Sequence, residues 1–392
     1  MKKLLHITNQ PTPYRLPQYK EFSNKFLKVR IHFSILFVSG RGRKRIWEFN
    51  EEDFNNLDCL NSTFGKPLTY KDVVNNIKKL NPDYITLAWA MDLLALRILV
   101  YSKLKKIPCF LYTGATKNAL SIVNQPKKFL SFVFRKFFFK LSNGFIAYGT
   151  RTKDYLLSNG VKSKLISIAI NTVDTNFFRD EVLKLKNSGT LVGNKSSFKN
   201  KDGESFKLHI LFIGELIKLK QIHYTIQAIA KLNRHDIALH IVGSGPEEIY
   251  LKSLSRDCNL SDSVFFHGYK QKNEIPYYLS ISDAAVFTSN KEERFGLVLV
   301  EYACAALPTI ASTYAGGTCD VVLDGVSGFE IPPENINQFS LSIATLADNL
   351  SLRKSMSESA FKHSINNLSL SKSADGYLDL FKKLNYIDLW FM

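Results

Sequence analysis

The feature that most constrains the fold is a repeated alternation of short apolar runs with amphipathic stretches. In the first half of the chain, the apolar runs predict β-strands at residues 4–8, 29–37, 84–88, 109–113, 144–148 and 166–169. The amphipathic stretches between them predict helices at residues 71–80, 93–106 and 128–141. Strands that alternate with helices form parallel sheets through right-handed crossovers, so this half is expected to be an α/β unit.

The same alternation restarts in the second half of the chain. Strands are expected at residues 208–213, 238–242, 264–267, 284–288 and 308–311. Helices are expected at residues 222–232, 247–258, 273–280, 297–306 and 336–366. Ligands of doubly wound sheets bind beyond the carboxyl ends of the strands, so a cleft between two such lobes is the expected site.

The domain organisation follows from this alternation and from one shift in composition. A chain of 392 residues fits two domains at roughly 100–200 residues each. We expect a first lobe at residues 1–178, completed by an amphipathic helix at 374–392, and a second lobe at 207–373. Residues 179–206 are rich in Gly, Ser, Lys and Asn, and are expected to be a linker or a mobile excursion.

Charge and cysteine content limit the partners and the compartment. The formal net charge of +17 favours an anionic partner, which could be phosphate, nucleic acid or an acidic membrane surface. The five cysteines are odd in number and lack CxxC spacing, which argues against a disulfide framework or a zinc site. The first apolar run is too short for a signal peptide, and no run of about 18 apolar residues predicts a membrane span. A cytoplasmic location is expected.

The sharpest motif is Glu293-Arg-Phe-Gly-Leu-Val-Leu-Val-Glu301, which follows an expected strand and opens an expected helix. Gly296 allows the backbone to approach a ligand closely, and the helix start near Leu297 offers free N–H groups to an anion. The rise of a helix could place the two carboxylates about 10 Å apart, which suits the two ends of a nucleotide sugar. The alternative is a loop glutamate and an unrelated surface glutamate.

Three other strand ends carry weaker signals. The segment after Gly214 brings lysines, including Lys220, toward a helix, where a lysine can neutralise a diphosphate without a metal. Gly243 lies in a Gly-Ser-Gly turn that favours a nucleotide site or, equally, a plain turn. Tyr269 could contact a nucleobase or could serve only in packing.

Together these segments resemble the retaining GT-B glycosyltransferases of family 4, also called glycosyltransferase group 1, of the bacterial surface-polysaccharide type. The resemblance is strong over most of residues 208–330 and weaker in the first lobe. It rests on the order and spacing of LFIGELIKLKQIHYTIQAIAKL, LHIVGSGPEE, VFFHGYKQKNEIPYYLSISDAAVFTSN, ERFGLVLVEYACAALPTIAS and AGGTCDVVLDGVSGF. It implies two Rossmann-like lobes facing a cleft, and transfer of a hexose from a nucleotide-sugar donor.

The resemblance also implies roles for individual residues. Glu293 would contact the donor sugar, Glu301 the ribose, and Lys220 the diphosphate. The backbone of residues 295–297 would meet sugar and phosphate. Glu293 and Lys220 are therefore the catalytic candidates. The donor-binding candidates are Gly214, Glu215, Lys220, Gly243, Tyr269, Glu293, Phe295, Gly296, Leu297 and Glu301.

Two positions depart from the pattern of this family. Glu215 stands where the family usually has a diphosphate-binding arginine, and Gln221 stands where it commonly has a glycine. Lys218 or another cation could compensate for the missing arginine. These departures concern the diphosphate contacts rather than the enzyme class.

The first lobe offers a different motif. Asn9-Gln-Pro-Thr-Pro-Tyr-Arg15 resembles the PxPYR opening of a subset that acts in bacterial surface-polysaccharide assembly. Arg15 is a candidate for contact with a phosphate or an acceptor, or else is a surface arginine after a proline turn. The acceptor-side candidates are Pro13, Tyr14, Arg15, Thr113 and Gly114. No catalytic histidine can be assigned in this lobe.

The resemblance implies retaining transfer that is independent of metal. No cofactor is expected, because the nucleotide sugar is a co-substrate, and the sequence contains no Asp-x-Asp. Front-face attack by the acceptor, with the leaving phosphate taking its proton, is the hypothesis. Residues 127–140 carry five cations, six phenylalanines and no acid, which suits an anionic membrane surface or a packed crossover helix.

The leading hypothesis is therefore a glycosyltransferase that extends a glycan or a lipid-linked glycan in cell-surface polysaccharide synthesis. It would lie in the cytoplasm, with peripheral contact at the inner face of the membrane as a further expectation. One alternative is a nucleotide-sugar 2-epimerase of the same fold. The other is a non-enzymatic protein that binds anions or nucleic acid, although no nucleic-acid motif is found and no nucleic-acid partner is expected.

Overall fold

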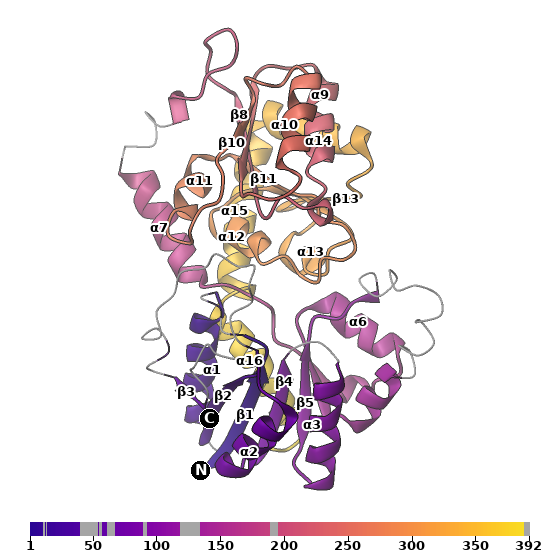
Figure 1. The fold of residues 1–392 in the computed structure, drawn as a ribbon. Helices are drawn as coiled ribbons and strands as arrows, with labels where there is room; N and C mark the ends of the chain where they lie inside the picture. The colour runs from indigo at the N-terminus through magenta and orange to yellow at the C-terminus, as the bar shows by residue number, and fades with distance from the viewer. Residues whose placement is uncertain are drawn as a thin grey trace. The chain divides into compact units, whose positions relative to one another are not determined.

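The computed structural model describes residues 1–10, 12, 14–39, 54, 57–60, 67–88, 92–117, 134–188 and 195–387. The chain divides into two compact units (Figure 1). Unit 1 comprises Met1–Val173 and Leu370–Met392, and unit 2 comprises Asp174–Ser369. The first unit thus ends at 173 rather than at the expected 178.

Unit 1 is built on a parallel sheet whose described strands follow the order β3-β2-β1-β4-β5-β6-β7. The strands are β1 (Lys2–Thr8), β2 (Ile31–Phe37), β3 (Asp58–Cys59), β4 (Tyr84–Ala88), β5 (Cys109–Thr113), β6 (Gly144–Ala147) and β7 (Ile166–Ile168). Helices cover both faces, so the central strands are buried almost throughout. This burial explains why they appear in the sequence as continuous apolar runs.

The helices of unit 1 include one from the far end of the chain. They include α1 (Leu16–Lys28), α2 (Tyr70–Leu80), α3 (Leu93–Leu104), α6 (Thr150–Ser158) and α16 (Leu370–Lys383). Tyr377 and Phe381 of α16 are fully buried against Phe22 and Phe26 of α1. Gly376 permits close approach, because a Cβ there would lie 1.9 Å from the Ile168 carbonyl oxygen.

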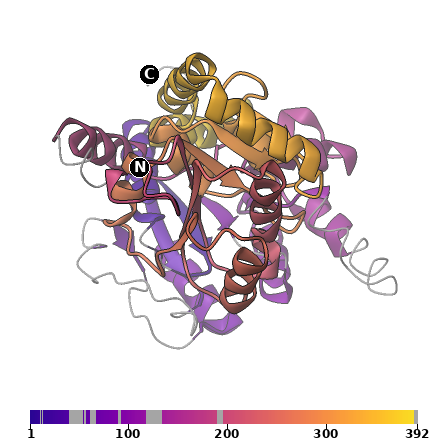
Figure 2. The same ribbon diagram turned by 90° about the horizontal axis from the view of Figure 1, so that it is seen from above.

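Unit 2 has a parallel sheet whose described strands follow the order β10-β9-β8-β11-β12-β13 (Figure 1, and Figure 2 from above). The strands are β8 (Leu208–Ile213), β9 (Ile237–Val242), β10 (Val264–Phe266), β11 (Ala284–Phe287), β12 (Thr309–Ser312) and β13 (Gly328–Ile331). The helices include α7 (Thr175–Asn187), α9 (His223–Leu232), α10 (Glu248–Asp257), α11 (Ile275–Ile281), α12 (Val298–Cys304), α13 (Thr318–Val321), α14 (Ile336–Asp348) and α15 (Leu350–Asn367). Two Rossmann-like α/β units are therefore present, as the alternation predicts.

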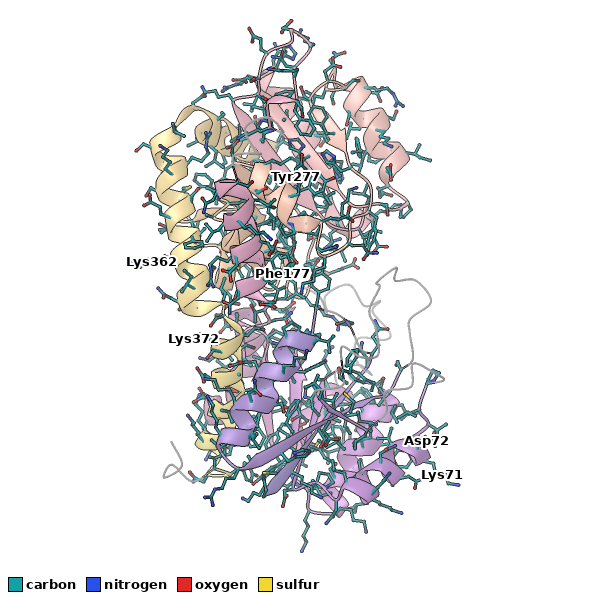
Figure 3. The ribbon with its side chains drawn as sticks, turned by 90° about the vertical axis from the view of Figure 1, so that its left-hand side faces the viewer. Lys71, Asp72, Phe177, Tyr277, Lys362 and Lys372 are labelled. Atoms are coloured by element: carbon teal, nitrogen blue, oxygen red, sulfur yellow. The ribbon has the colours of Figure 1, made fainter. Side chains whose placement is uncertain are left out.

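The expected linker at 179–206 is wrong over its first part. Residues up to Asn187 belong to α7, whose N-terminus is capped by the Asp174 side chain. Phe178 and Val182 bury the apolar side of α7, which packs on α11 and α12. Figure 3 marks Phe177 on α7 and Tyr277 on α11. The high lysine content of the exposed side concealed this helix in the sequence.

Two other expectations need correction. The single helix expected at 336–366 is two helices, because Asn349 leaves the helical conformation and caps α15 by accepting from the Leu352 N–H group at 2.9 Å. The C-terminal helix begins at Leu370, earlier than the expected 374.

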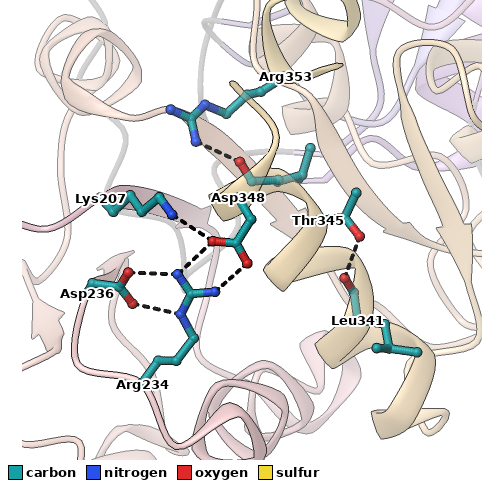
Figure 4. A network of polar contacts seen from close by, with 8 residues as sticks. Lys207, Arg234, Asp236, Leu341, Thr345, Asp348 and Arg353 are labelled. Carbon is teal, nitrogen blue, oxygen red and sulfur yellow. Dashed lines mark hydrogen bonds and ion pairs between the residues drawn. The ribbon is translucent and has the colours of Figure 1, made fainter. Parts of the chain in front are cut away.

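The edge of unit 2 near residue 207 is tied together by a charged network (Figure 4). Arg234 makes two bonds to the Asp236 carboxylate and two to the Asp348 carboxylate, at 2.7–3.0 Å, and Lys207 also pairs with Asp348 at 2.7 Å. Planar guanidinium groups suit such paired contacts. The network joins α14 to the beginning of the sheet, away from the carboxyl ends of its strands.

Candidate functional site

The carboxyl ends of β8 and β11 define the first candidate site. The strand order of unit 2 reverses between these neighbouring strands, since β9 and β10 lie on one side and β12 and β13 on the other. Loops diverge at such a switch point and leave room for a ligand. Here the two loops are joined, because the Asn290 N–H group donates to the Leu219 carbonyl at 2.8 Å and the Thr288 hydroxyl donates to the Lys220 carbonyl at 2.7 Å.

Lys220 and Glu293, the two catalytic candidates, meet at this switch point. Lys220 Nζ lies 2.5 Å from Glu293 Oε2, and each side chain is 17% exposed. The ammonium also lies 5.5 Å from the centre of the Phe287 ring. The Glu293 carboxylate is therefore paired with the lysine that is expected to bind a diphosphate.

The loop from Glu293 to α12 is shaped by glycines. Gly296 has a φ of 91°, and a Cβ there would lie 2.4 Å from Phe287 Cζ. The N–H groups of Gly316 and Gly317 donate to the carbonyls of Glu293 and Phe295, each at 3.0 Å. The sequence analysis included these two glycines in a segment that carries the resemblance, but assigned them no role. Leu297 is the N-cap of α12, which has no capping side chain.

Gly214 and Gly243 have a packing role that explains the Gly-Ser-Gly turn. Gly243 has a φ of 145°, and a Cβ there would lie 1.8 Å from the Gly214 carbonyl oxygen. Its N–H group donates to the Gly268 carbonyl at 2.9 Å. The three glycines bring the ends of β8, β9 and β10 together, and Gly243 is required here for backbone approach whether or not a ligand is present.

Glu301, the second glutamate of the motif, lies inside unit 2. It is 4% exposed on α12, and burial raises the pKa of its carboxyl to about 8, with Lys272 opposing the shift. Lys272 Nζ lies 4.5 Å from the centre of the Phe177 ring, and burial lowers its pKa while Asp174 and Glu301 oppose that shift. The two glutamates thus differ in environment, since Glu293 is ion-paired and Glu301 is desolvated.

Tyr269 lies at the same end of the sheet. It follows β10 and is 38% exposed, and its hydroxyl donates to Gln271 Oε1 at 3.3 Å. The ring is therefore accessible.

Glu215 and Gln221, the two departures from the family pattern, differ in exposure to solvent. Glu215 is exposed, as is Lys218. Gln221 has φ 48° and ψ 34°, a left-handed conformation that glycine adopts without strain. Its Oε1 atom is buried without a hydrogen-bond partner. The backbone thus still has the conformation that glycine favours at this position.

We expect Gln221→Gly to raise the free energy of unfolding of unit 2 by up to about 1 kcal/mol. Removal of the left-handed strain and of a buried unpaired carbonyl outweighs the greater flexibility of glycine in the unfolded chain. Denaturant unfolding measures the change. Asn233→Gly is the matched control, since Asn233 has a φ of 49° but asparagine tolerates this conformation better. A loss of stability in Gln221→Gly would refute the explanation.

A row of three histidines, which the sequence reasoning missed, crosses one face of the sheet in unit 2. His209 Nδ1 lies 2.9 Å from His240 Nε2, and His240 Nδ1 lies 3.0 Å from His267 Nε2. Phe198 packs edge-on against the central ring, and Lys195 pairs with Asp283 at 2.7 Å. The segment at 195–206, expected to be part of a linker, therefore covers this row.

The environment of the row disfavours charge on its imidazoles. Burial lowers the pKa of His209 and of His267 to about 4, and lowers that of His240 well below its usual value. The Lys195 ammonium lowers the pKa of His209 and His240 further, while Asp283 opposes the shift at His209; Lys270 acts on His267. The row is thus a chain of neutral imidazoles near neutral pH.

Three of the acceptor-side candidates of unit 1, Arg15, Thr113 and Gly114, contact Tyr148, to which the sequence analysis assigned no role. Arg15 Cζ lies 5.4 Å from the centre of the Tyr148 ring. A Cβ at Gly114 would lie 2.5 Å from that ring, and the Tyr148 N–H group donates to the Thr113 carbonyl at 3.0 Å. Tyr14 is partly exposed. Pro13 lies outside the described residues.

The basic, phenylalanine-rich segment is described only from residue 134, and residues 134–141 are helical. Phe138 is fully buried and Phe137 is 56% exposed. The helix therefore both packs on its sheet and presents an aromatic ring to solvent. Among the residues that the structure describes, no helix is long and apolar enough to cross a membrane.

The fold and the strand-end site define an α/β protein of two doubly wound units with a lysine and a glutamate at a switch point. Residues 194–363, within unit 2, match the family model described as Glycosyl transferases group 1. Unit 2 is therefore similar to this family over most of its length, and the match supports a transferase enzyme.

Individual proteins agree with this assignment. An uncharacterized glycosyltransferase of Methanocaldococcus jannaschii is 27% identical to this chain. The region that matches covers 64% of this chain and 60% of that relative's length. A glycosyltransferase from Rickettsia africae superposes with a TM-score of 0.73 at 20% identity, covering 98% of this chain and 99% of that one. Anabaena HepE, solved with UDP-glucose, has a TM-score of 0.69 at 18% identity, covering 99% of this chain and 100% of that one. The predicted GT-B fold is confirmed.

Proposed function

We propose that this protein is a retaining glycosyltransferase of the family 4 type. It moves a hexose from a nucleotide sugar to a glycan or lipid-linked glycan in cell-surface polysaccharide synthesis. The observation that carries the proposal is the placement of Lys220 beside Glu293 at the β8–β11 switch point. A diphosphate and a sugar are the groups that such a cation and carboxylate can hold together.

The chemistry assigns separate tasks to the two residues. As the bond between the anomeric carbon and the donor phosphate oxygen breaks, charge develops on the diphosphate, and Lys220 stabilises it. The acceptor hydroxyl forms its new bond on the same face of the sugar, and its proton passes to the leaving phosphate oxygen. Glu293, released by Lys220, orients the sugar hydroxyls. No step requires a metal ion.

Glu301 and Tyr269 extend the donor site in this proposal. Tyr269 is accessible to a nucleobase, and Glu301 would accept a hydrogen bond from the ribose. Since Glu301 is 4% exposed, a ribose contact requires movement of the groups that cover it. Lys272, whose charge acts on Glu301 and whose ammonium packs over the Phe177 ring, is a candidate for this movement. Donor binding would then also draw the carboxyl toward its charged form.

A binding screen followed by product analysis tests the function. UDP-, GDP- and ADP-sugars are titrated into the protein, beginning with UDP-glucose because the similar HepE chain was solved with it. The best donor is then incubated with and without candidate acceptors. Sugar transfer to an acceptor supports the proposal. Conversion of the donor sugar without an acceptor would identify an epimerase, and absence of binding by any nucleotide sugar would contradict the proposal.

A lipid-linked acceptor makes contact with a membrane surface useful, and we propose peripheral binding through residues 127–140. The exposed Phe137 and the basic side chains of its helix support this part. We expect Phe137→Ser to reduce co-sedimentation with vesicles containing anionic phospholipid several-fold at low salt, whereas Leu157→Ser on α6 should have a smaller effect. Equal sedimentation of Phe137→Ser and the unmodified protein would contradict this contact.

A further inference from the structure

Arg15 has an unusual environment in unit 1. Its guanidinium packs over the Tyr148 ring, and its Nη1 group donates to Gln18 Oε1 at 2.6 Å. Tyr112 is a further hydrogen-bond partner of the guanidinium. The Gln18 amide in turn donates to the Tyr112 hydroxyl at 3.3 Å and to Ser373 Oγ at 3.0 Å. The arginine is therefore held in one orientation by buried groups.

No anion accompanies this cation in the described part of the chain. No aspartate or glutamate there lies within ion-pair distance of Arg15, and burial raises the pKa of the neighbouring Tyr19 and Tyr112 hydroxyls. An arginine that is mostly removed from water without a carboxylate is costly, and a cation–π contact offsets only part of that cost. Such a group is typical of a site that receives its anion from a ligand.

The surroundings favour a negative ligand in two further ways. Arg15 is the N-cap of α1, a helix of 13 residues that has neither a capping side chain nor an acid in its first turn. Pro17 has no N–H group, so the first-turn N–H groups that can meet an anion are those of Leu16 and Gln18. Arg15 also lies on the loop after β1, and the strand order of unit 1 reverses between β1 and β4. The arginine thus stands at the switch point of its own sheet.

A buried amide marks the same neighbourhood. The Asn171 N–H group donates to the Tyr148 carbonyl at 2.9 Å. Asn171 therefore adjoins the tyrosine whose ring packs against the Arg15 guanidinium. Asn171 is 4% exposed, and its Oδ1 atom has no partner among the described groups. An unpaired acceptor next to Tyr148, the residue on which Arg15 packs, suits a ligand that brings hydroxyl groups together with its negative charge.

We propose that Arg15 and the N-terminus of α1 bind a phosphate group carried by the acceptor. The inference rests on the proposed function, since it names the chemical class of the acceptor. A planar guanidinium forms paired hydrogen bonds to phosphate oxygens, and a helix N-terminus adds N–H donors to the same group. A lipid diphosphate and a soluble sugar phosphate share this chemistry.

The test uses the full-length protein and two probes, farnesyl diphosphate and glucose 1-phosphate, titrated calorimetrically. Saturating UDP is present, so that the Lys220 site is filled, and the titration is repeated with Lys220→Met. The variants are Arg15→Gln, Arg15→Lys and the control Lys20→Gln, which removes an exposed cation from the same helix. We expect Arg15→Gln to weaken binding of at least one probe about tenfold or more, and Lys20→Gln to leave it nearly unchanged.

The outcomes separate the possibilities. Selective loss of farnesyl diphosphate binding indicates a lipid-linked acceptor, and selective loss of glucose 1-phosphate binding indicates a soluble one. Equal binding by Arg15→Gln and Lys20→Gln overturns the site. If Arg15→Gln unfolds, Arg15→Lys decides, because a purely structural arginine would leave probe affinity unchanged in a folded Arg15→Lys. Failure of UDP to bind the unmodified protein counts against the proposed function alone, because probe binding in Lys220→Met does not depend on UDP.

Discussion

Replacing Glu293 with glutamine is expected to slow sugar transfer by about 100-fold and, at the same time, to tighten the binding of free nucleoside diphosphate. The substitution is expected to impair transfer but to improve diphosphate binding, because Glu293 has a different partner in each case. In the structure its carboxylate pairs with Lys220 at 2.5 Å, and a diphosphate that binds Lys220 competes with this pair. In the reacting complex the same carboxylate is proposed to orient the donor sugar.

The size of each effect follows from the interaction lost. An amide keeps the shape of Glu293 but has no charge, so Lys220 is released to the diphosphate, and a gain in affinity of about threefold to tenfold is expected from the loss of a partly buried pair. The transfer rate falls because glutamine cannot accept as strongly from the sugar hydroxyls, and hydrogen bonds to charged groups contribute roughly 1.5–3 kcal/mol.

Two measurements on one variant check the prediction. Initial rates with saturating donor give the loss of turnover, and calorimetry with UDP, or with the diphosphate of the best donor, gives the affinity. Glu292→Gln removes a neighbouring exposed carboxylate and is the control. Weaker diphosphate binding by Glu293→Gln, or turnover equal to that of Glu292→Gln, would show that the pair does not work in this way.

The histidine row is expected to lower the stability of unit 2 by about 2–4 kcal/mol between pH 7 and pH 4.5. Glu301 opposes this loss, because its pKa of about 8 makes the folded chain take up a proton that the unfolded chain does not bind over the same range. The pKa values of His209 and His267 are about 4 in the folded protein, and that of His240 is lower than its usual value. Well above pH 6.5 the imidazoles are neutral in both states, and the contribution of the row is at its full value. As the pH falls toward 4, the unfolded chain takes up protons that the folded chain does not, so stability is lost.

The loss of stability is smaller than three fully buried imidazoles would cause, because His267 is partly exposed and solvent screens its interactions. Denaturant unfolding of the full chain at a series of pH values measures the effect. His240→Phe removes the central imidazole and should reduce the pH dependence, although it lowers stability at pH 7 by leaving two ring nitrogens without partners. His235→Phe, which lies outside the row, is the control. The same pH dependence in both variants would exclude the row as its cause.

Most strands were predictable because burial on both sides of a parallel sheet produces continuous apolar runs such as 84–88 and 208–213. The edge strands β3 and β13 were not expected, because they are short and only partly buried and so leave no such run. Helix α7 and the break at Asn349 were not, since a lysine-rich exposed side resembles a linker and a single asparagine cap leaves a weak signal. The GT-B fold was predicted from the order and spacing of five segments that resemble those of a known family. No single residue would have predicted it.

The candidate site was predictable in its residues but not in its contacts. Lys220 and Glu293 are separated by 73 positions, and their pairing depends on β8 and β11 lying side by side, which the sequence does not reveal. The histidine row needs the register of three strands for the same reason. Tyr148 was missed because a strand-end tyrosine is ordinary until Arg15 is seen to pack on it.

The central claim is that the β8–β11 switch point binds the diphosphate of a nucleotide sugar through Lys220. Calorimetric titration of the best-bound nucleotide sugar into the unmodified protein, Lys220→Met and the control Lys231→Met tests it most directly. We predict binding at least about 30-fold weaker for Lys220→Met, and nearly unchanged binding for Lys231→Met, whose side chain is exposed. Equal affinities for Lys220→Met and the unmodified protein would contradict the account.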